Sequence, residues 1–290
     1  MMLNFERRLS ICDVGAAISA TTERPEWDGL VEAGLAKVIG FEPDENALSA
    51  LLKFSKHYEF LPYFIGNGQP QKFHLNSFPE TNSLLPSNHD FLKHYAMLGP
   101  LMKTKEIIDC QTTTLDEALD GRKIDVLKVD VQGAALDVLQ GGLETLKNTL
   151  FVKCEVEFNP LYEGQPLFAE IDQFMREQGF MLFKFSPMQN LPLLPLDMPG
   201  EKLLTYGQVG WSDAIYVPNH DRIPTFPKHD LQLVALFSAL YFGYTELACH
   251  LLMRADPETG MDDVRGFLNE AQTLKSLSYS VAGQVHRVNL

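Results

Sequence analysis

The residues best suited to acid–base chemistry stand where apolar runs end. Lys128, Asp130 and Gln132 lie in "IDVLKVDVQG", and Glu155 and Glu157 stand two apart in "LFVKCEVEF". Two neighbouring carboxylates raise each other's proton affinity, which suits one of them to act as a general base near neutral pH. Asp130, at the tip of its run, can orient or deprotonate an acceptor group. The candidate catalytic residues are therefore Asp130, Glu155 and Glu157.

Each of these side chains also has a structural explanation. Asp130 could cap the helix that follows it, because an acid near a helix N-terminus is favoured by the dipole and by free amide groups. Glu155 and Glu157 could hold Lys128 and Lys153 in an ion-pair network. They could also bind a divalent metal through their oxygen atoms. The metal ranks below the base, and no metal site is predicted.

A loop after the second carboxylate run offers residues that could contact an acceptor. In "LYEGQP" these are Tyr162 and Gln165. A tyrosine followed by glycine and proline is also an ordinary way to anchor a loop. With Lys128 and Gln132, these two residues form the predicted substrate-binding set.

The elements that must position these residues alternate between strand and helix patterns. Short runs rich in β-branched residues predict strands, and the segments between them carry apolar residues at helical spacing. This alternation predicts an α/β fold with a mainly parallel central sheet flanked by helices. The pattern "TLDE" is typical of a capping box that begins a helix. The predicted strands are "LSICDV", "KVIGF", "YEFLPYFIG", "IDVLKVD" and "LFVKCEVEF".

The chain becomes helical after about Asp221, which predicts a main domain over 1–220 and a helical appendage over 221–290. The first helical stretch carries an apolar face that either the main domain or a second copy of the chain must cover. Self-association is the alternative we favour, so a homodimer through these helices is expected. The face consists of Leu233, Leu236, Phe237, Leu240 and Tyr241.

Ligands of an open parallel sheet bind outside the carboxyl ends of its strands. Four of the five predicted strands finish with a carboxylate, and a shared site explains the set better than separate helix caps. Gly15 in "DVGA" allows a tight turn that brings backbone amides close to a ligand, and Glu42 in "GFEPD" can accept hydrogen bonds from both hydroxyls of a ribose. The predicted cofactor-binding residues are Asp13, Gly15, Ala16, Glu42, Pro43 and Gly66.

The glycine pattern separates two classes of nucleoside cofactor. "DVGAAIS" lacks the second and third glycines of the dinucleotide fingerprint, and Glu42 lies farther from Asp13 than the roughly 20 residues typical of NAD sites. An adenosine cofactor without a diphosphate fits better, which indicates S-adenosylmethionine. An NAD-dependent oxidoreductase is the weaker alternative. A non-catalytic Rossmann-like binding module that acts through its helical tail stays open as another.

Composition limits the partners and the compartment. The 290-residue chain has a formal net charge of -14, which repels a phosphate backbone, so nucleic acid is not an expected partner. Its four cysteines stand singly, which is typical of a reducing cytoplasm. Asp13 interrupts the first apolar run, which argues against a secretion signal. No apolar run reaches the ~18 residues of a membrane span, so neither a membrane partner nor membrane insertion is expected.

The motifs together resemble one family. "IDVLKVDVQGAALDVLQGGLETL" followed by "EVEFNPLYEGQPLFAEIDQFMREQGF" is similar to the FkbM family of S-adenosylmethionine-dependent methyltransferases, and "CDVGAAIS", "GFEPDENALSAL", "NSLLPSN" and "GWSDAIYVP" fall in the expected order. The resemblance spans roughly Leu9 to Pro218. It implies a Rossmann-like methyltransferase fold and O-methylation of a hydroxyl on a small molecule, sugar or secondary metabolite. The family commonly has glutamate where this chain has Ala135, and often histidine where it has Glu157.

Overall fold

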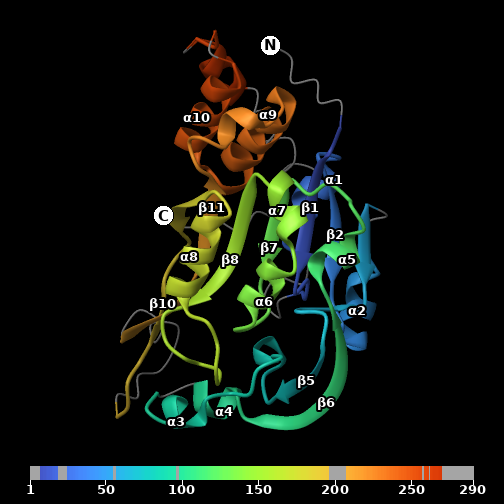
Figure 1. Cartoon of the computed structure of the whole chain (residues 1–290), viewed down its shortest axis with the longest axis vertical. Coiled ribbons are helices and arrows are strands. Elements are labelled where there is room, and N and C mark those ends of the chain that lie inside the picture. Colours follow the sequence, from blue (N-terminus) through green and yellow to red (C-terminus); the bar gives the residue numbers. More distant parts are fainter. Residues whose placement is uncertain are drawn as a thin grey trace.

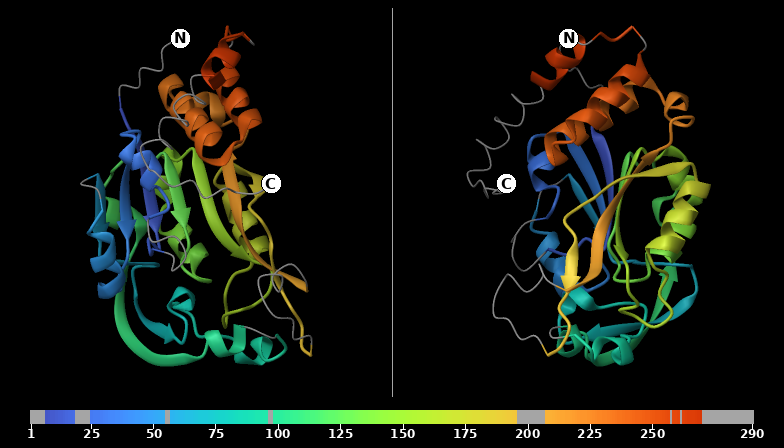
Figure 2. Two further views of the ribbon diagram at one scale, coloured as in Figure 1. Left: turned by 180° about the vertical axis from the view of Figure 1, so that it is seen from behind. Right: turned by 90° about the vertical axis from the view of Figure 1, so that its left-hand side faces the viewer.

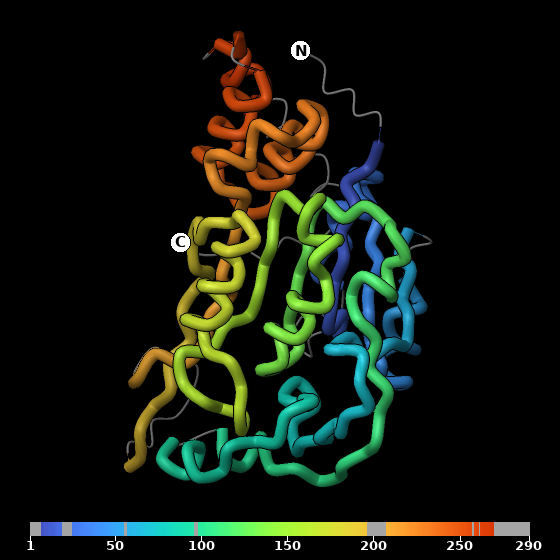
Figure 3. Tube along the Cα trace, viewed as in Figure 1, coloured from blue at the N-terminus to red at the C-terminus, as the bar shows by residue number. Residues whose placement is uncertain are grey.

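A computed structural model describes residues 7–18, 25–54, 57–95, 98–195, 207–256, 258–260 and 262–269. Its centre is a twisted sheet whose strands begin near the top of Figure 1 and end near the middle of the molecule. A group of helices lies above the sheet, and a curved segment lies below the carboxyl ends of its strands. The tube in Figure 3 shows the same three levels along the chain.

The central sheet has the order β10-β11-β8-β7-β1-β2-β3, and β9 also pairs with β11. The five strands from β8 to β3 pair in parallel, whereas β11 runs antiparallel to β8. The order reverses between β1 and β7, which is where an open α/β sheet binds its ligand. The predicted mainly parallel sheet is therefore confirmed. The strands are β1 Leu9–Val14, β2 Ala36–Phe41, β3 Tyr58–Leu61, β7 Val126–Val129, β8 Phe151–Glu157, β9 Phe180–Phe185, β10 Gln189–Leu191 and β11 Gln208–Pro218.

Helices cover both faces of the sheet (Figure 2). Neighbouring residues of β1 show this, since Ile11 belongs to the core under the C-terminal helices and Cys12 to the core under the opposite helices. The predicted capping box is confirmed at the start of α5, where Thr114 and Glu117 exchange side-chain and backbone hydrogen bonds. The helices outside the C-terminal region are α1 Asp28–Glu32, α2 Glu45–Leu51, α5 Leu115–Leu119, α6 Ala135–Gln140, α7 Leu143–Asn148 and α8 Phe168–Glu177.

The prediction of one continuous strand over "YEFLPYFIG" is wrong. The chain leaves the central sheet after β3, because Pro62 has no N–H to donate to a ladder. It then forms a second sheet of order β4-β6-β5, which with three short helices makes up the curved segment below the strand ends. Its elements are β4 Phe64–Ile65, β5 Pro70–Asn76, η1 Pro79–Thr81, α3 His89–Leu92, α4 Leu98–Leu101 and β6 Thr104–Thr113.

The C-terminal helices cover the amino-terminal half of one sheet face. They share one hydrophobic core with β1, β2, β7 and β8, and Phe237 lies 5.1 Å from Phe151 between ring centroids. The apolar face predicted from Leu233 to Tyr241 is thus covered by the chain itself, and it does not need a second copy of the chain to cover it. These elements are η3 Ile223–Thr225, α9 Lys228–Phe237, the π-helical turn η4 Ser238–Phe242 and α10 Thr245–Ala255.

The cysteines and the lengths of the helices bear on the expectations about compartment and membrane. All four cysteines are free. Within the described ranges no helix is both long enough and apolar enough to cross a bilayer.

Candidate active site

A buried ion pair lies at the point where the strand order reverses. Asp13 of β1 and Lys128 of β7 are register partners, and Lys128 Nζ lies 3.0 Å from Asp13 Oδ1. Burial alone would lower the pKa of Lys128, but Asp13, Asp130 and Glu26 outweigh it and raise this pKa well above its usual value. Lys128 therefore stays charged behind the site. This geometry fits the ion-pair alternative for Lys128 better than direct contact with a substrate.

The ion pair continues into residues that the sequence analysis missed. Trp27 Nε1 donates a hydrogen bond of 2.7 Å to Asp13 Oδ2, and Glu26 Oε1 accepts one of 2.6 Å from Lys153 Nζ. Lys153 Nζ also lies 3.3 Å from Asp213 of β11. The sequence carries little signal for this network, because Glu26 and Trp27 lie in an irregular stretch. Asp213 becomes relevant only through the antiparallel pairing that places it opposite Glu155.

Gly15 allows β1 and β7 to meet closely. Its φ is 80°, and a Cβ added to it would lie 1.9 Å from the carbonyl oxygen of Asp130. Asp130 N donates to Val14 O at 3.0 Å, and the amides of Gly15 and Ala16 both donate to Phe41 O at 3.1 Å. The chain turns tightly here as predicted, but the two amides that were expected to face a ligand are bonded to Phe41 O, so the turn fixes the end of β1 against the ends of both neighbouring strands.

Asp130, Glu155 and Gln132 form a bridged cluster. Gln132 Nε2 donates to Asp130 Oδ1 at 2.9 Å and to Glu155 Oε2 at 2.7 Å. Burial would raise the pKa of Asp130, but Lys128 and the Gln132 amide hold it below its usual value. Burial and the neighbouring Asp130 raise the pKa of Glu155 well above its usual range. The two carboxyl groups thus differ in proton affinity, since the surroundings of Asp130 favour its ionised form and those of Glu155 favour its protonated form.

Two neighbours fix the unusual conformation of Gln132. Its φ is 53°, and its carbonyl oxygen accepts a 2.5 Å hydrogen bond from Ser83 Oγ in the curved segment. The Tyr162 hydroxyl lies 3.2 Å from Gln132 Oε1 and 3.1 Å from Thr81 O. Because Gln132 Oε1 accepts the hydrogen bond from the Tyr162 hydroxyl, Gln132 Nε2 faces the carboxylates of Asp130 and Glu155. Tyr162 is fully buried behind Gln132, so the structure gives it a supporting position instead of the predicted acceptor contact.

Glu157 and Gln165 are buried near the same end of β8. Glu157 is 2% exposed, and its atom Oε2 has no hydrogen-bond partner among the described residues. Burial, together with the charge of Asp130, raises the pKa of Glu157 to about 8. Gln165 Oε1 accepts from Tyr162 N at 2.6 Å, which anchors the loop, while its atom Nε2 is buried and also lacks a described partner.

Glu42 directly follows β2, and few groups stabilise the negative charge of its carboxylate. Its Oε1 accepts a 2.8 Å hydrogen bond from Asp44 N, just beyond Pro43. Burial raises the pKa of Glu42 to about 7, so its charged form lacks the compensation that further donors would give. Gly66, also predicted to bind the cofactor, directly follows β4 at the edge of the second sheet. There Gly66 N bonds Thr113 O at 2.9 Å.

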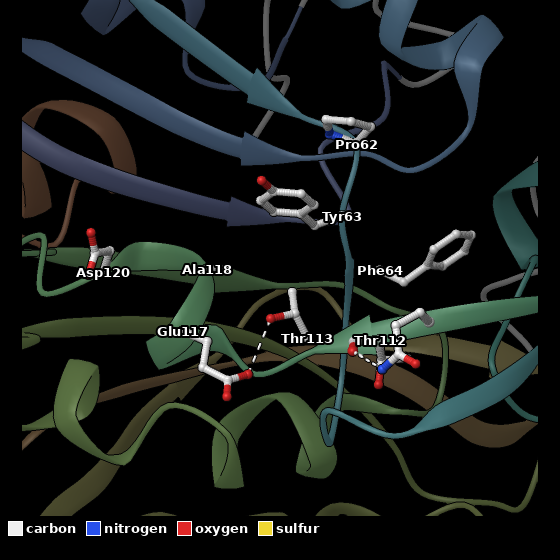
Figure 4. Close-up of a pocket in the computed structure, with 9 residues that line it drawn as sticks. Pro62, Tyr63, Phe64, Thr112, Thr113, Glu117, Ala118 and Asp120 are labelled. Carbon is white, nitrogen blue, oxygen red and sulfur yellow. Dashed lines mark hydrogen bonds between the residues drawn. The ribbon is translucent and has the colours of Figure 1, made fainter.

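A cavity of about 500 Å³ is lined by the segment between β3 and β4, by β6 and by α5 (Figure 4). The ring of Tyr63 stacks on Phe41 with centroids 6.3 Å apart, and Phe41 directly precedes Glu42. The sides of the cavity come from α5 and β6, including Glu117, Thr112 and Thr113. The described part of the chain holds no cluster of three or more His, Cys, Asp or Glu residues arranged to hold a metal ion.

Comparison with protein families shows to which family the chain belongs. The model of the methyltransferase FkbM domain matches residues 13–182, more than half of the chain. The chain belongs to the FkbM methyltransferase family. Every predicted site residue lies inside the matched segment, whereas Asp213 and the C-terminal helices lie outside it. Membership in a methyltransferase family removes the oxidoreductase alternative.

The individual proteins that this FkbM protein resembles either match only part of the chain or have low sequence identity. The 2-O-methyltransferase NoeI of Sinorhizobium fredii is 40% identical over 93 residues, which are 30% of this chain and 35% of NoeI. The match therefore spans about a third of that relative.

Two solved structures are similar at low identity. Magnesium protoporphyrin IX methyltransferase from Synechocystis PCC 6803 with bound SAM has a TM-score of 0.38 at 12% identity, covering 73% of this chain and 71% of that one. The N-terminal domain of EvdMO1 with SAH bound has a TM-score of 0.34 at 10% identity, covering 74% and 76%. The assignment of the Rossmann-like methyltransferase fold rests on the strand order and the family match of this chain. S-adenosylmethionine is the cofactor of that fold, as the sequence analysis expects.

Proposed function

We propose that this FkbM protein transfers the methyl group of S-adenosylmethionine to a hydroxyl oxygen of a small molecule, with a sugar as the favoured acceptor. The observation that carries the proposal is the partly exposed Asp130, bridged by Gln132 to Glu155, at the reversal of the strand order. The similarity to a 2-O-methyltransferase over 93 residues supports transfer to oxygen.

The residues at the ends of β1 and β2 fit such a cofactor. Two hydroxyl donors would compensate the buried charge of Glu42, which Asp44 N alone does not do, since the pKa of Glu42 is raised to about 7. Gly15 has no side chain, so the Asp130 carbonyl lies against the turn and Asp130 is held beside the end of β1. When bound, S-adenosylmethionine supplies an electrophilic methyl group.

Asp130 is placed to receive the proton of the acceptor. Its side chain is 33% exposed, so unlike Glu157 it can reach a ligand. It would accept the hydrogen bond of the acceptor hydroxyl and align the oxygen for attack. The hydroxyl becomes strongly acidic as the carbon–oxygen bond forms, so even a carboxylate with a lowered pKa can take its proton. The proton then resides on Asp130, whose side chain is partly exposed and can release it to solvent.

The curved segment beneath the strand ends supports a small acceptor. Its Ser83 and Thr81 contact Gln132 and Tyr162, so the segment comes up against the catalytic cluster. Such a cover over the strand ends suits an acceptor that can be enclosed and kept from water. Nucleic acid and membranes are not proposed as partners.

A labelling experiment tests the proposal. The full chain is incubated with methyl-labelled S-adenosylmethionine and a panel of sugars, aromatic alcohols, amines and carboxylic acids. The expected product carries the label as an ether, which resists alkali, on one of the hydroxyl compounds. Label found only on nitrogen, or released by alkali as methanol from an ester, would contradict transfer to a hydroxyl. Failure to bind S-adenosylhomocysteine would favour the binding-module alternative.

A further inference from the structure

Tyr241, a side chain of the C-terminal helices, contacts the network that lies behind the site. Tyr241 belongs to η4, outside the segment that the family model matches. Its hydroxyl lies 3.1 Å from Glu26 O and 3.2 Å from Glu26 Oε1. Its ring lies 5.0 Å from that of Trp27 between centroids. A single residue of the tail therefore contacts both members of the pair Glu26 and Trp27.

That pair holds the cofactor side of the site in two ways. Trp27 Nε1 donates to one oxygen of Asp13, whose other oxygen accepts from Lys128 Nζ. Glu26 bonds Lys153 at 2.6 Å and lies 4.0 Å from Lys128. Lys128 Nζ in turn lies 3.3 Å from the carbonyl oxygen of Gly15. A displacement of residues 26 and 27 would therefore move Asp13 and Lys128, and with them the turn that follows β1.

We propose that Tyr241 is a positioning residue for cofactor binding: its hydroxyl fixes Glu26 and Trp27, which fix Asp13 and Lys128 beneath the turn at Gly15. The inference rests on the proposed function, because it presumes that S-adenosylmethionine binds at this turn. It adds that the tail completes the site and does not merely cover the sheet.

The hydroxyl can be separated from the ring by substitution. Tyr241→Phe keeps the ring contacts with Trp27 and Phe237 but removes the donor to Glu26. Tyr244→Phe is the matched control, since Tyr244 lies in the same segment and stacks on Phe242, and its hydroxyl is not bonded to Glu26. Both variants are made in the full chain.

The first measurement is the affinity for S-adenosylhomocysteine by calorimetry. Tyr241→Phe should weaken binding by roughly 3- to 10-fold, the range for one lost hydrogen bond, while Tyr244→Phe should stay within about 2-fold of the parent. An equal loss of affinity in Tyr241→Phe and Tyr244→Phe would show a general packing effect and overturn the inference.

The second measurement does not depend on the cofactor. The chain has two tryptophans, so a Trp27→Phe variant assigns the indole N–H signal of Trp27 in a nitrogen–proton NMR spectrum. Tyr241→Phe should shift this signal clearly more than Tyr244→Phe does, because the bond to Asp13 is disturbed. Equal shifts would overturn the positioning role. If the parent binds no S-adenosylhomocysteine, the proposed function and the cofactor half of the inference fail, and the indole signal still decides whether Tyr241 holds Trp27.

Discussion

Among the single residues, Asp130 is the one proposed to take the proton of the acceptor hydroxyl. Lys128 at 3.7 Å and the Gln132 amide keep it ionised, and its side chain is partly exposed. Asp130→Asn keeps the shape but removes the charge. Turnover on a hydroxyl acceptor should fall by roughly 10²-fold or more, while affinity for S-adenosylhomocysteine and the melting temperature change little. Undiminished turnover would reduce Asp130 to a structural residue.

Glu42 gives the site a dependence on pH. It must be ionised to accept two ribose hydroxyls, and burial raises its pKa to about 7 in the free protein. The ionised fraction therefore grows as the pH rises, and affinity for S-adenosylhomocysteine should increase roughly 10-fold between about pH 6 and pH 8. Calorimetry across this range checks the sign. Glu42→Gln should bind weakly with little dependence on pH, and an equally steep profile in this variant would assign the titration to another group.

The sequence predicted part of this residue-level arrangement. Asp13, Glu42, Asp130 and Glu157 follow from the positions where strands end, since parallel strands bring their carboxyl ends to one edge. Burial could not be predicted in the same way. The enclosed position of Tyr162 depends on the curved segment, and the role of Trp27 depends on a contact between distant parts of the chain.

At the level of secondary-structure elements, the turn after β1 holds the ends of β1, β2 and β7 together. Gly15 has φ 80° and lies against Asp130 O, whereas Gly34 has φ 73° with no atom near its potential Cβ. Gly34→Ala should therefore cost only the left-handed backbone strain, about 1–2 kcal/mol of unfolding free energy. Gly15→Ala adds a collision between backbones and should cost clearly more, as well as abolish cofactor binding. Urea unfolding compares the two, and equal losses would contradict the close approach.

Prediction of the elements succeeded where the pattern was local and failed where pairing was distant. The alternation of strands and helices and the capping box at Thr114 follow from short-range chemistry. The antiparallel pairing of β5 with β6 was missed because these half-buried strands carry charges among their apolar residues, as in "TKEIIDCQTT". Pro62 did signal a break, but periodicity alone does not say which sheet the next strand joins.

At the scale of the whole molecule, the C-terminal helices and the sheet share one core. Phe237 is buried between Trp27 and Phe151, so Phe237→Ala should destabilise the chain by about 3–5 kcal/mol. Met253→Ala, at a side chain that is 45% exposed, is the control and should cost little. Calorimetric melting should show one cooperative transition that shifts downward. A separate early transition in Phe237→Ala would instead support an independent helical domain beyond residue 220.

The central claim is that the ends of β1 and β2 bind S-adenosylmethionine, and one titration tests it most directly. Calorimetry at about pH 8 compares S-adenosylhomocysteine binding to the parent chain and to Glu42→Ala. We expect a single binding site in the parent chain. In Glu42→Ala the binding free energy should fall by roughly 2–4 kcal/mol, because the charge-assisted bonds to two ribose hydroxyls are lost. No binding to the parent, or an unchanged dissociation constant in Glu42→Ala, would contradict it.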